Sequence, residues 1–201
     1  MPWVYRGIFW YSNIGYGDTK DKLKECAVSF SKLFGKEYHI VAGKKGKLIT
    51  IDIFFHKDHF YHLLGLQKLK DIQKTWGNKN KIFDNIIEGN ITYNDISKSD
   101  FFHEISNRLD YFTYLEQIID SEKLMIKYNK NKCQSNIEAK YIIYTSMDNM
   151  NIHYFIDIDE SITKYFGRSF FARDDNKYIQ DKPYKILKKT KFTDGNTVEL
   201  I

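Results

Sequence analysis

The segments IHYFIDI (Ile152–Ile158) and SFFAR (Ser169–Arg173) decide the fold expected for this chain. In each segment the side chains alternate between two faces, which is typical of a β-strand. The same pattern runs through the second half of the sequence, where polar loops separate short apolar runs. The strands predicted there are Leu124–Asn129, Ile137–Thr145, Ile152–Ile158, Ser169–Arg173 and Tyr184–Phe192.

Helices and one hairpin are predicted for the first half. Apolar side chains recur at helical spacing in Thr19–Phe34. Two strand-like runs, Glu37–Ala42 and Leu48–Phe55, flank a polar loop with two glycines, which predicts a hairpin. The other predicted helices are Asp58–Gln73, Asn80–Glu88 and Asp100–Ile119. Helices followed by strands indicate an α+β fold, in which N-terminal helices pack on an antiparallel β-sheet.

The length of 201 residues fits a single domain. We expect this domain to span residues 19–201, after an aromatic segment at residues 1–18 that packs on it or on a partner. The sequence has no run of about 18 apolar residues, so no membrane-spanning helix is expected. It also lacks the basic start and apolar block of a signal peptide. We therefore expect a cytoplasmic protein that does not contact a membrane.

The charge balance is mildly basic. The formal net charge is +5 and the sequence pI is about 8.9. This surplus suits a polyanionic partner such as a nucleic acid, and a solvated surface of mixed charge explains it equally well. Most basic residues are lysines, because the sequence holds four arginines: Arg6, Arg108, Arg168 and Arg173. Each arginine is therefore more informative than any single lysine.

No metal or other cofactor is expected. Cys26 and Cys133 lie far apart in the sequence and cannot form a paired zinc site. His56, His59 and His62 are three residues apart, but His56 precedes the predicted helix and would point away from the other two. The motifs GxxxxGKS/T, GxGxxG, HExxH and GxSxG are missing, which argues against kinases, dinucleotide dehydrogenases, zincins and α/β-hydrolases.

His62 allows two interpretations. On the predicted helix it lies on the side of Leu66 and Leu69, close to the interior. A core histidine bonded to a backbone carbonyl would explain this position. A general acid or base is the functional alternative, because imidazole titrates near neutral pH.

Ser169, Phe171 and Arg173 share one face of a predicted strand. A hydroxyl, an aromatic ring and a guanidinium in one row can bind a phosphate and stack a nucleobase. An edge strand with a solvated arginine is the structural alternative.

Other candidates also allow two interpretations each. His153 fits an active surface or an exposed sheet face. Lys127 and Lys140 could contact phosphates or face solvent. The last predicted strand could bind a polyanion backbone or be a solvated edge, because it carries a basic cluster of Lys185, Lys188, Lys189 and Lys191.

Three segments together resemble one known family. They are FHKDHFYHLLGLQKL (Phe55–Leu69), IEAKY (Ile137–Tyr141) and SFFAR (Ser169–Arg173), the last followed by Tyr178, Gln180 and the basic run Leu187–Lys189. Their order and spacing resemble the phage-associated nuclease-like domains grouped with barnase, EndoU, the tRNA-cleaving colicins and RelE. The resemblance extends from about Leu23 to Lys191.

This resemblance implies N-terminal helices followed by an antiparallel sheet, and RNA cleavage without a metal. By their positions in the matching segments, His62 is the implied acid or base, Arg173 clamps the phosphate and Ser169 bonds to it. Tyr178 and Gln180 would orient the substrate. Further substrate contacts are expected from Phe171, Lys127, Lys140 and Lys188.

The leading hypothesis is an endoribonuclease of a toxin or of phage–host conflict, in which a ribose 2′-hydroxyl attacks the adjacent phosphodiester. RNA is then the substrate, and a neutralising protein would be a second partner. The alternative is a non-catalytic phage or defence protein that binds a protein or a nucleic acid with the same fold. The two differ in geometry, because the nuclease requires His62 and Arg173 to meet at one open pocket.

Overall fold

The computed structural model describes residues 20–193 and 195–201, so the aromatic segment predicted at residues 1–18 lies outside the described residues. The α-helices are α1 (Lys22–Ser31), α2 (Lys57–Leu63), α3 (Ile82–Glu88), α4 (Tyr93–Ser97), α5 (Ser106–Tyr111) and α6 (Leu115–Ser121). The strands are β1 (Glu37–Lys44), β2 (Lys47–Phe54), β3 (Leu124–Lys127), β4 (Tyr141–Met147), β5 (Met150–Asp159), β6 (Lys164–Arg173), β7 (Tyr184–Thr193) and β8 (Asn196–Glu199). Short 3₁₀ helices occur at Leu66–Lys68, Gln73–Trp76, Lys79–Lys81, Phe102–Glu104 and Phe112–Tyr114.

The strands close into a barrel. Within the described chain the order of neighbours is β1-β2-β6-β5-β4-β3-β7, and β7 pairs back onto β1 through Glu37–Gly43. The strand β8 extends β7 at one end as an additional strand. β2 and β6 run parallel where Ile53 meets Tyr165, whereas the other pairs are antiparallel. The result is a mixed, seven-stranded barrel with one extra strand.

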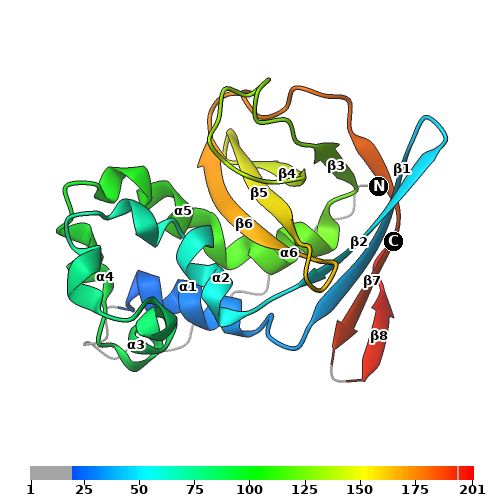
Figure 1. Ribbon diagram of the computed structural model, residues 1–201. Helices are drawn as coiled ribbons and strands as arrows, with labels where there is room; N and C mark the ends of the chain where they lie inside the picture. The colour runs from blue at the N-terminus through cyan, green and yellow to red at the C-terminus, as the bar shows by residue number, and fades with distance from the viewer. Residues whose placement is uncertain (1–19, 194) are drawn as a thin grey trace, which may run out of the picture.

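The predicted fold class, N-terminal helices packed on an antiparallel β-sheet, is therefore wrong. Each predicted strand overlaps an observed one, but alternation along a strand does not reveal that β1 and β7, from opposite ends of the described chain, will pair. Closure satisfies the backbone N–H and C=O groups that both edges of an open sheet would expose. Helices α1 to α5 gather at one side of the barrel instead of covering a sheet (Figure 1).

The predicted helix Asn80–Glu88 ends where expected, because α3 ends at Glu88 with Gly89 at its C-cap, but α2 ends earlier than predicted. The helix begins after His56 rather than Asp58, and it ends at Leu63 instead of continuing to Gln73. Gly65 adopts φ +80° just beyond the end, a left-handed conformation that glycine tolerates and that terminates helices. α2 packs against β6, so this early stop leaves its last turn beside that strand.

Both faces of β5 are buried, in two different clusters. Ile152, Tyr154 and Ile156 join the main core, which continues into the aromatic side chains of the helices. The opposite face contributes Phe155 to a second cluster, whose members are Tyr128, Cys133, Ile142, Phe155, Phe171 and Tyr178. Phe171 and Tyr178 also line the pocket described below, so the second cluster supports that pocket from beneath.

Candidate functional site

One surface pocket of about 680 Å³ collects side chains from four parts of the fold. The first part is the end of α2 with the following turn, and the second is α5 with the turn before it. The third is the loop between β3 and β4, and the fourth is β6 with the loop that follows it. The lining residues are His62, Gln67, Lys68, Glu104, Asn107, Arg108, Asn136, Ile137, Glu138, Arg168, Ser169, Phe171, Ala172, Arg173 and Tyr178.

The pocket contains five of the predicted site residues: His62, Ser169, Phe171, Arg173 and Tyr178. His62 and Arg173 come from opposite halves of the chain, and the fold brings them to the same pocket. In the last turn of α2 the His62 side chain is exposed, so the interpretation of His62 as a core histidine is wrong.

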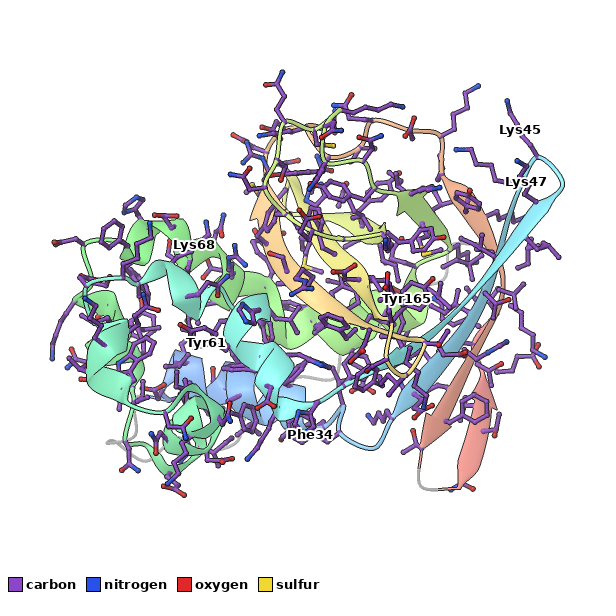
Figure 2. The ribbon with its side chains drawn as sticks, viewed as in Figure 1. Phe34, Lys45, Lys47, Tyr61, Lys68 and Tyr165 are labelled. Carbon is purple, nitrogen blue, oxygen red and sulfur yellow. The ribbon has the colours of Figure 1, made fainter. Side chains whose placement is uncertain are left out.

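The other predicted contacts lie outside the pocket lining. Gln180 donates an Nε2 hydrogen bond to the backbone carbonyl of Lys177 at 2.9 Å. The other three predicted substrate contacts outside the lining are exposed lysines on three different segments, namely Lys127, Lys140 and Lys188. Other lysines also lie far from the pocket. In Figure 2, the pocket residue Lys68 lies on the helical side of the molecule, whereas Lys45 and Lys47 lie at the far tip of the β1–β2 hairpin.

Arg108 of α5 is a pocket residue that the sequence analysis did not select. It is 4% exposed, and its Nη1 donates to the carbonyl of Leu63 at 3.0 Å and to Oγ of Ser169 at 3.2 Å. Its guanidinium carbon lies 5.3 Å from the centre of the Phe171 ring. The scarcity of arginine in the sequence was the signal that could have identified it.

Gly65 fixes the position of this guanidinium. A Cβ atom at Gly65 would lie 2.8 Å from Cζ and 2.9 Å from Nε of Arg108, closer than real side chains approach. The backbone of the α2 stop and the face of Phe171 therefore hold the guanidinium between them. Gly65 thus terminates α2 and, because it has no side chain, also leaves the space that the Arg108 guanidinium occupies beside Ser169.

Three other cations of the pocket are paired with carboxylates. Lys68 contacts Glu104 at 3.0 Å, and Arg168 contacts Asp157 at 2.8 Å. Arg173 donates through Nε and Nη2 to the two oxygens of Asp175, and its Nε contact is 2.8 Å long. This pairing raises the pKa of Arg173 and lowers the pKa of Asp175 to about 2. The guanidinium expected to clamp a phosphate thus holds an internal carboxylate.

A family model described as phage-Barnase-EndoU-ColicinE5/D-RelE like nuclease4 matches residues 22–196, which include every residue of the pocket. The chain belongs to this family. The resemblance identified from the three sequence segments is confirmed, and it assigns this nuclease-like chain a nucleic acid as the class of substrate. Searches of curated proteins and of solved structures found no match. Over the described residues, every helix is too short or too polar to cross a bilayer.

The three segments that carry the resemblance all reach the pocket of this nuclease-like domain. The first supplies His62, Gln67 and Lys68, the second supplies Ile137 and Glu138, and the third supplies Ser169, Phe171, Ala172 and Arg173. Segments that are far apart in the sequence therefore form one surface. Glu138 of the second segment lines this surface and pairs with Lys130.

Both interpretations of His153 are wrong, because the side chain is fully buried in the nuclease-like domain. Its ring lies 5.7 Å from Phe171 and 5.5 Å from Tyr178, and neither ring nitrogen has a hydrogen-bond partner in the described residues. Burial lowers the pKa of His153 to about 4, so the ring is neutral at pH 7. His153 supports the pocket from behind and does not line it.

Two of the clustered lysines on β7 are not free to bind a polyanion. Lys189 is fully buried, and its ammonium donates to the carbonyls of Ile119, Asp120 and Glu122 at 2.5–3.1 Å, where α6 ends. Lys191 pairs with Asp120 at 2.6 Å. Neither interpretation of the basic cluster, a polyanion contact or a solvated edge, therefore holds for Lys189 and Lys191.

Two of the three histidines considered as metal ligands cap a helix instead. His56 and His59 form the capping box of α2, and the His59 ring stacks on Phe166 at 5.0 Å. Burial lowers the pKa of His59 to about 4. In the residues that the structure describes, no group of three His, Cys, Asp or Glu side chains is arranged to hold a metal ion.

Proposed function

We propose that this chain is an endoribonuclease that cleaves RNA by attack of a ribose 2′-hydroxyl on the adjacent phosphodiester, in a toxin or phage–host conflict. One observation carries the proposal: His62 from the first segment of the family motif lines one surface pocket together with Ser169 and Arg173 from the third. A non-catalytic binding protein does not require an exposed imidazole and several cations to converge in this way.

The reaction needs two proton transfers and stabilisation of charge. A base takes the proton of the 2′-hydroxyl while the 2′-oxygen bonds to phosphorus. The bond from phosphorus to the 5′-oxygen then breaks, and an acid protonates that oxygen. The products are a 2′,3′-cyclic phosphate and a 5′-hydroxyl. We assign one of the two proton transfers to His62, because its imidazole is exposed at the pocket and histidine is the side chain most often used as a general acid or base.

Ser169 and Arg173 are assigned to the phosphate. Ser169 accepts a hydrogen bond from Arg108, which leaves its own O–H free to donate to a phosphoryl oxygen. Arg173 would exchange Asp175 for the phosphate, since a guanidinium binds both groups with the same pair of N–H donors. Preorganised donors of this kind stabilise the charge that builds up in the transition state.

The aromatic and outlying residues are assigned to the rest of the substrate. Phe171 is 9% exposed and Tyr178 is 7% exposed, so each can offer a ring edge to a nucleotide in the pocket. Nucleotides beyond the pocket would contact the exposed polar side chains outside it, namely Lys127, Lys140, Lys188 and Gln180.

The test is cleavage of total RNA by the purified chain in the presence of EDTA. We expect fragments that end in a cyclic phosphate, detected by their resistance to poly(A) polymerase until the phosphate is removed. His62→Ala should reduce the rate about 10²–10⁴-fold, the usual contribution of a positioned acid or base. Arg173→Ala should also reduce it.

The matched control is His39→Ala, because His39 pairs with Asp52 on the β1–β2 hairpin and lies outside the pocket lining. This variant should cleave like the unmodified chain. Intact RNA, or full activity of both the His62 and the Arg173 variants, would refute the proposal.

A further inference from the structure

Arg108 is a buried cation whose donors are not all used. A guanidinium has five N–H groups. Nη1 of Arg108 serves the Leu63 carbonyl and Ser169 Oγ, whereas Nε is buried and finds no acceptor among the described residues. A buried donor without a partner costs free energy, so an N–H group left in this state needs an explanation.

The charge of Arg108 also lacks a direct counter-ion, because the Glu104 carboxylate attracts it only from beyond ion-pair distance. No carboxylate in the described part of the chain forms an ion pair with it, unlike Lys68, Arg168 and Arg173 of the same pocket. Burial lowers the pKa of Arg108 to about 10, so the group stays charged at neutral pH. Burying a charge without a counter-ion is costly, and the fold retains it at the wall of an open pocket.

A purely structural role does not account for this arrangement. Capping the Leu63 carbonyl at the end of α2 requires one donor, and a neutral side chain could supply it. The structure instead holds a complete guanidinium against Gly65 and over the face of Phe171. Such a rigid, planar set of charged donors matches the oxygens of a phosphoryl group.

We propose that Arg108 and Ser169 form a phosphoryl-binding subsite within the pocket, with Arg108 as its counter-charge. The inference rests on the proposed function for the source of the phosphoryl group, which is the RNA backbone. Arg108 is preorganised for this role, since its guanidinium is not committed to a carboxylate. Arg173, in contrast, must first release Asp175.

The first experiment measures the Tm of the full chain in sodium phosphate against sodium chloride of equal ionic strength. A ligand that binds the folded state raises Tm with its concentration, so each variant is compared with its own chloride value. Phosphate should stabilise the unmodified chain. Arg108→Met should weaken the apparent affinity for phosphate about tenfold or more. Arg168→Met is the matched control: it removes a positive charge from the same pocket, but from an arginine paired with Asp157, and should retain the phosphate effect.

Equal phosphate effects in Arg108→Met and in the unmodified chain would overturn the inference. An equal loss in both arginine variants would overturn it too, because it would indicate a diffuse positive field. If Arg108→Met does not fold, ¹⁵N spectra of the unmodified chain decide the matter, since phosphate should shift the Nε–H signal of Arg108. An unmoved signal would refute the subsite.

A second experiment uses a 2′-O-methyl RNA oligonucleotide, which cannot be cleaved by 2′-hydroxyl attack. Fluorescence anisotropy should show that inorganic phosphate competes with this RNA and that Arg108→Met weakens its binding. Phosphate binding without competition by the RNA would overturn the assignment to the RNA backbone. If RNA is not cleaved but both binding results are as expected, the subsite is supported and the proposed reaction is refuted. If RNA is cleaved but Arg108→Met changes neither phosphate nor RNA binding, only the subsite is refuted.

Discussion

Gly65→Ala tests whether the pocket depends on one close contact. Gly65 has φ +80°, and an added Cβ would approach Cζ of Arg108 to 2.8 Å. Forcing alanine into the left-handed conformation costs about 1–2 kcal/mol. Moving the guanidinium away also breaks a charged hydrogen bond to Leu63 or Ser169, worth about 1.5–3 kcal/mol. The free energy of unfolding should therefore fall by about 2.5–5 kcal/mol.

Gly89→Ala is the matched control for the backbone cost. Gly89 ends α3 with φ +84°, and nothing lies within 4 Å of the position that an added Cβ would take. Its substitution should cost only the conformational part, about 1–2 kcal/mol. Urea denaturation followed by circular dichroism measures both variants, and the difference between them isolates the contact with Arg108.

A double-mutant cycle then tests the cause. In an Arg108→Ala background the contact is gone, so Gly65→Ala should cost no more than Gly89→Ala. If Gly65→Ala costs the same with and without the Arg108 side chain, the guanidinium is not held against Gly65. That result would refute the reasoning on which the preorganised position of Arg108 depends.

Three further predictions concern groups around the pocket and barrel. The pKa of His153 is about 4, below its ordinary value of 6.5. Between pH 6.5 and pH 4 the imidazole is therefore protonated in the unfolded chain but neutral in the folded one. The free energy of unfolding should fall as the pH is lowered through this range. His153→Phe should weaken this loss in urea titrations at pH 4 to 6.5; an unchanged pH profile contradicts it. Lys189→Met should lower the free energy of unfolding by about 3 kcal/mol, because it removes the buried contacts of the ammonium. The same substitution at the exposed neighbour, Lys188→Met, should lower it by about 0.5 kcal/mol. Equal decreases in urea denaturation would exclude the buried contacts as the cause. Asp175→Asn should free Arg173 and tighten binding of 2′-O-methyl RNA in anisotropy measurements, whereas weaker binding would exclude Arg173 from the RNA contact.

Local patterns in the sequence were sufficient to select several of the residues that line the candidate pocket. Alternation placed Ser169, Phe171 and Arg173 on one face of a strand, and the motif around His62 identified the family. These inferences succeed because strand periodicity and motif spacing are properties of neighbouring residues. The glycine at position 65 was visible too, although the prediction extended the helix through it.

Only the tertiary structure decided which faces are covered and which strands meet. Closure of β1 on β7 turned a predicted open sheet into a barrel, and it required pairing between opposite ends of the described chain. Burial of His153 and Lys189, and the unpaired charge of Arg108 behind Ser169, follow from packing between distant segments. Alternation reveals which side chains share a face, but contacts between residues far apart in sequence determine whether that face meets solvent, core or another charged group.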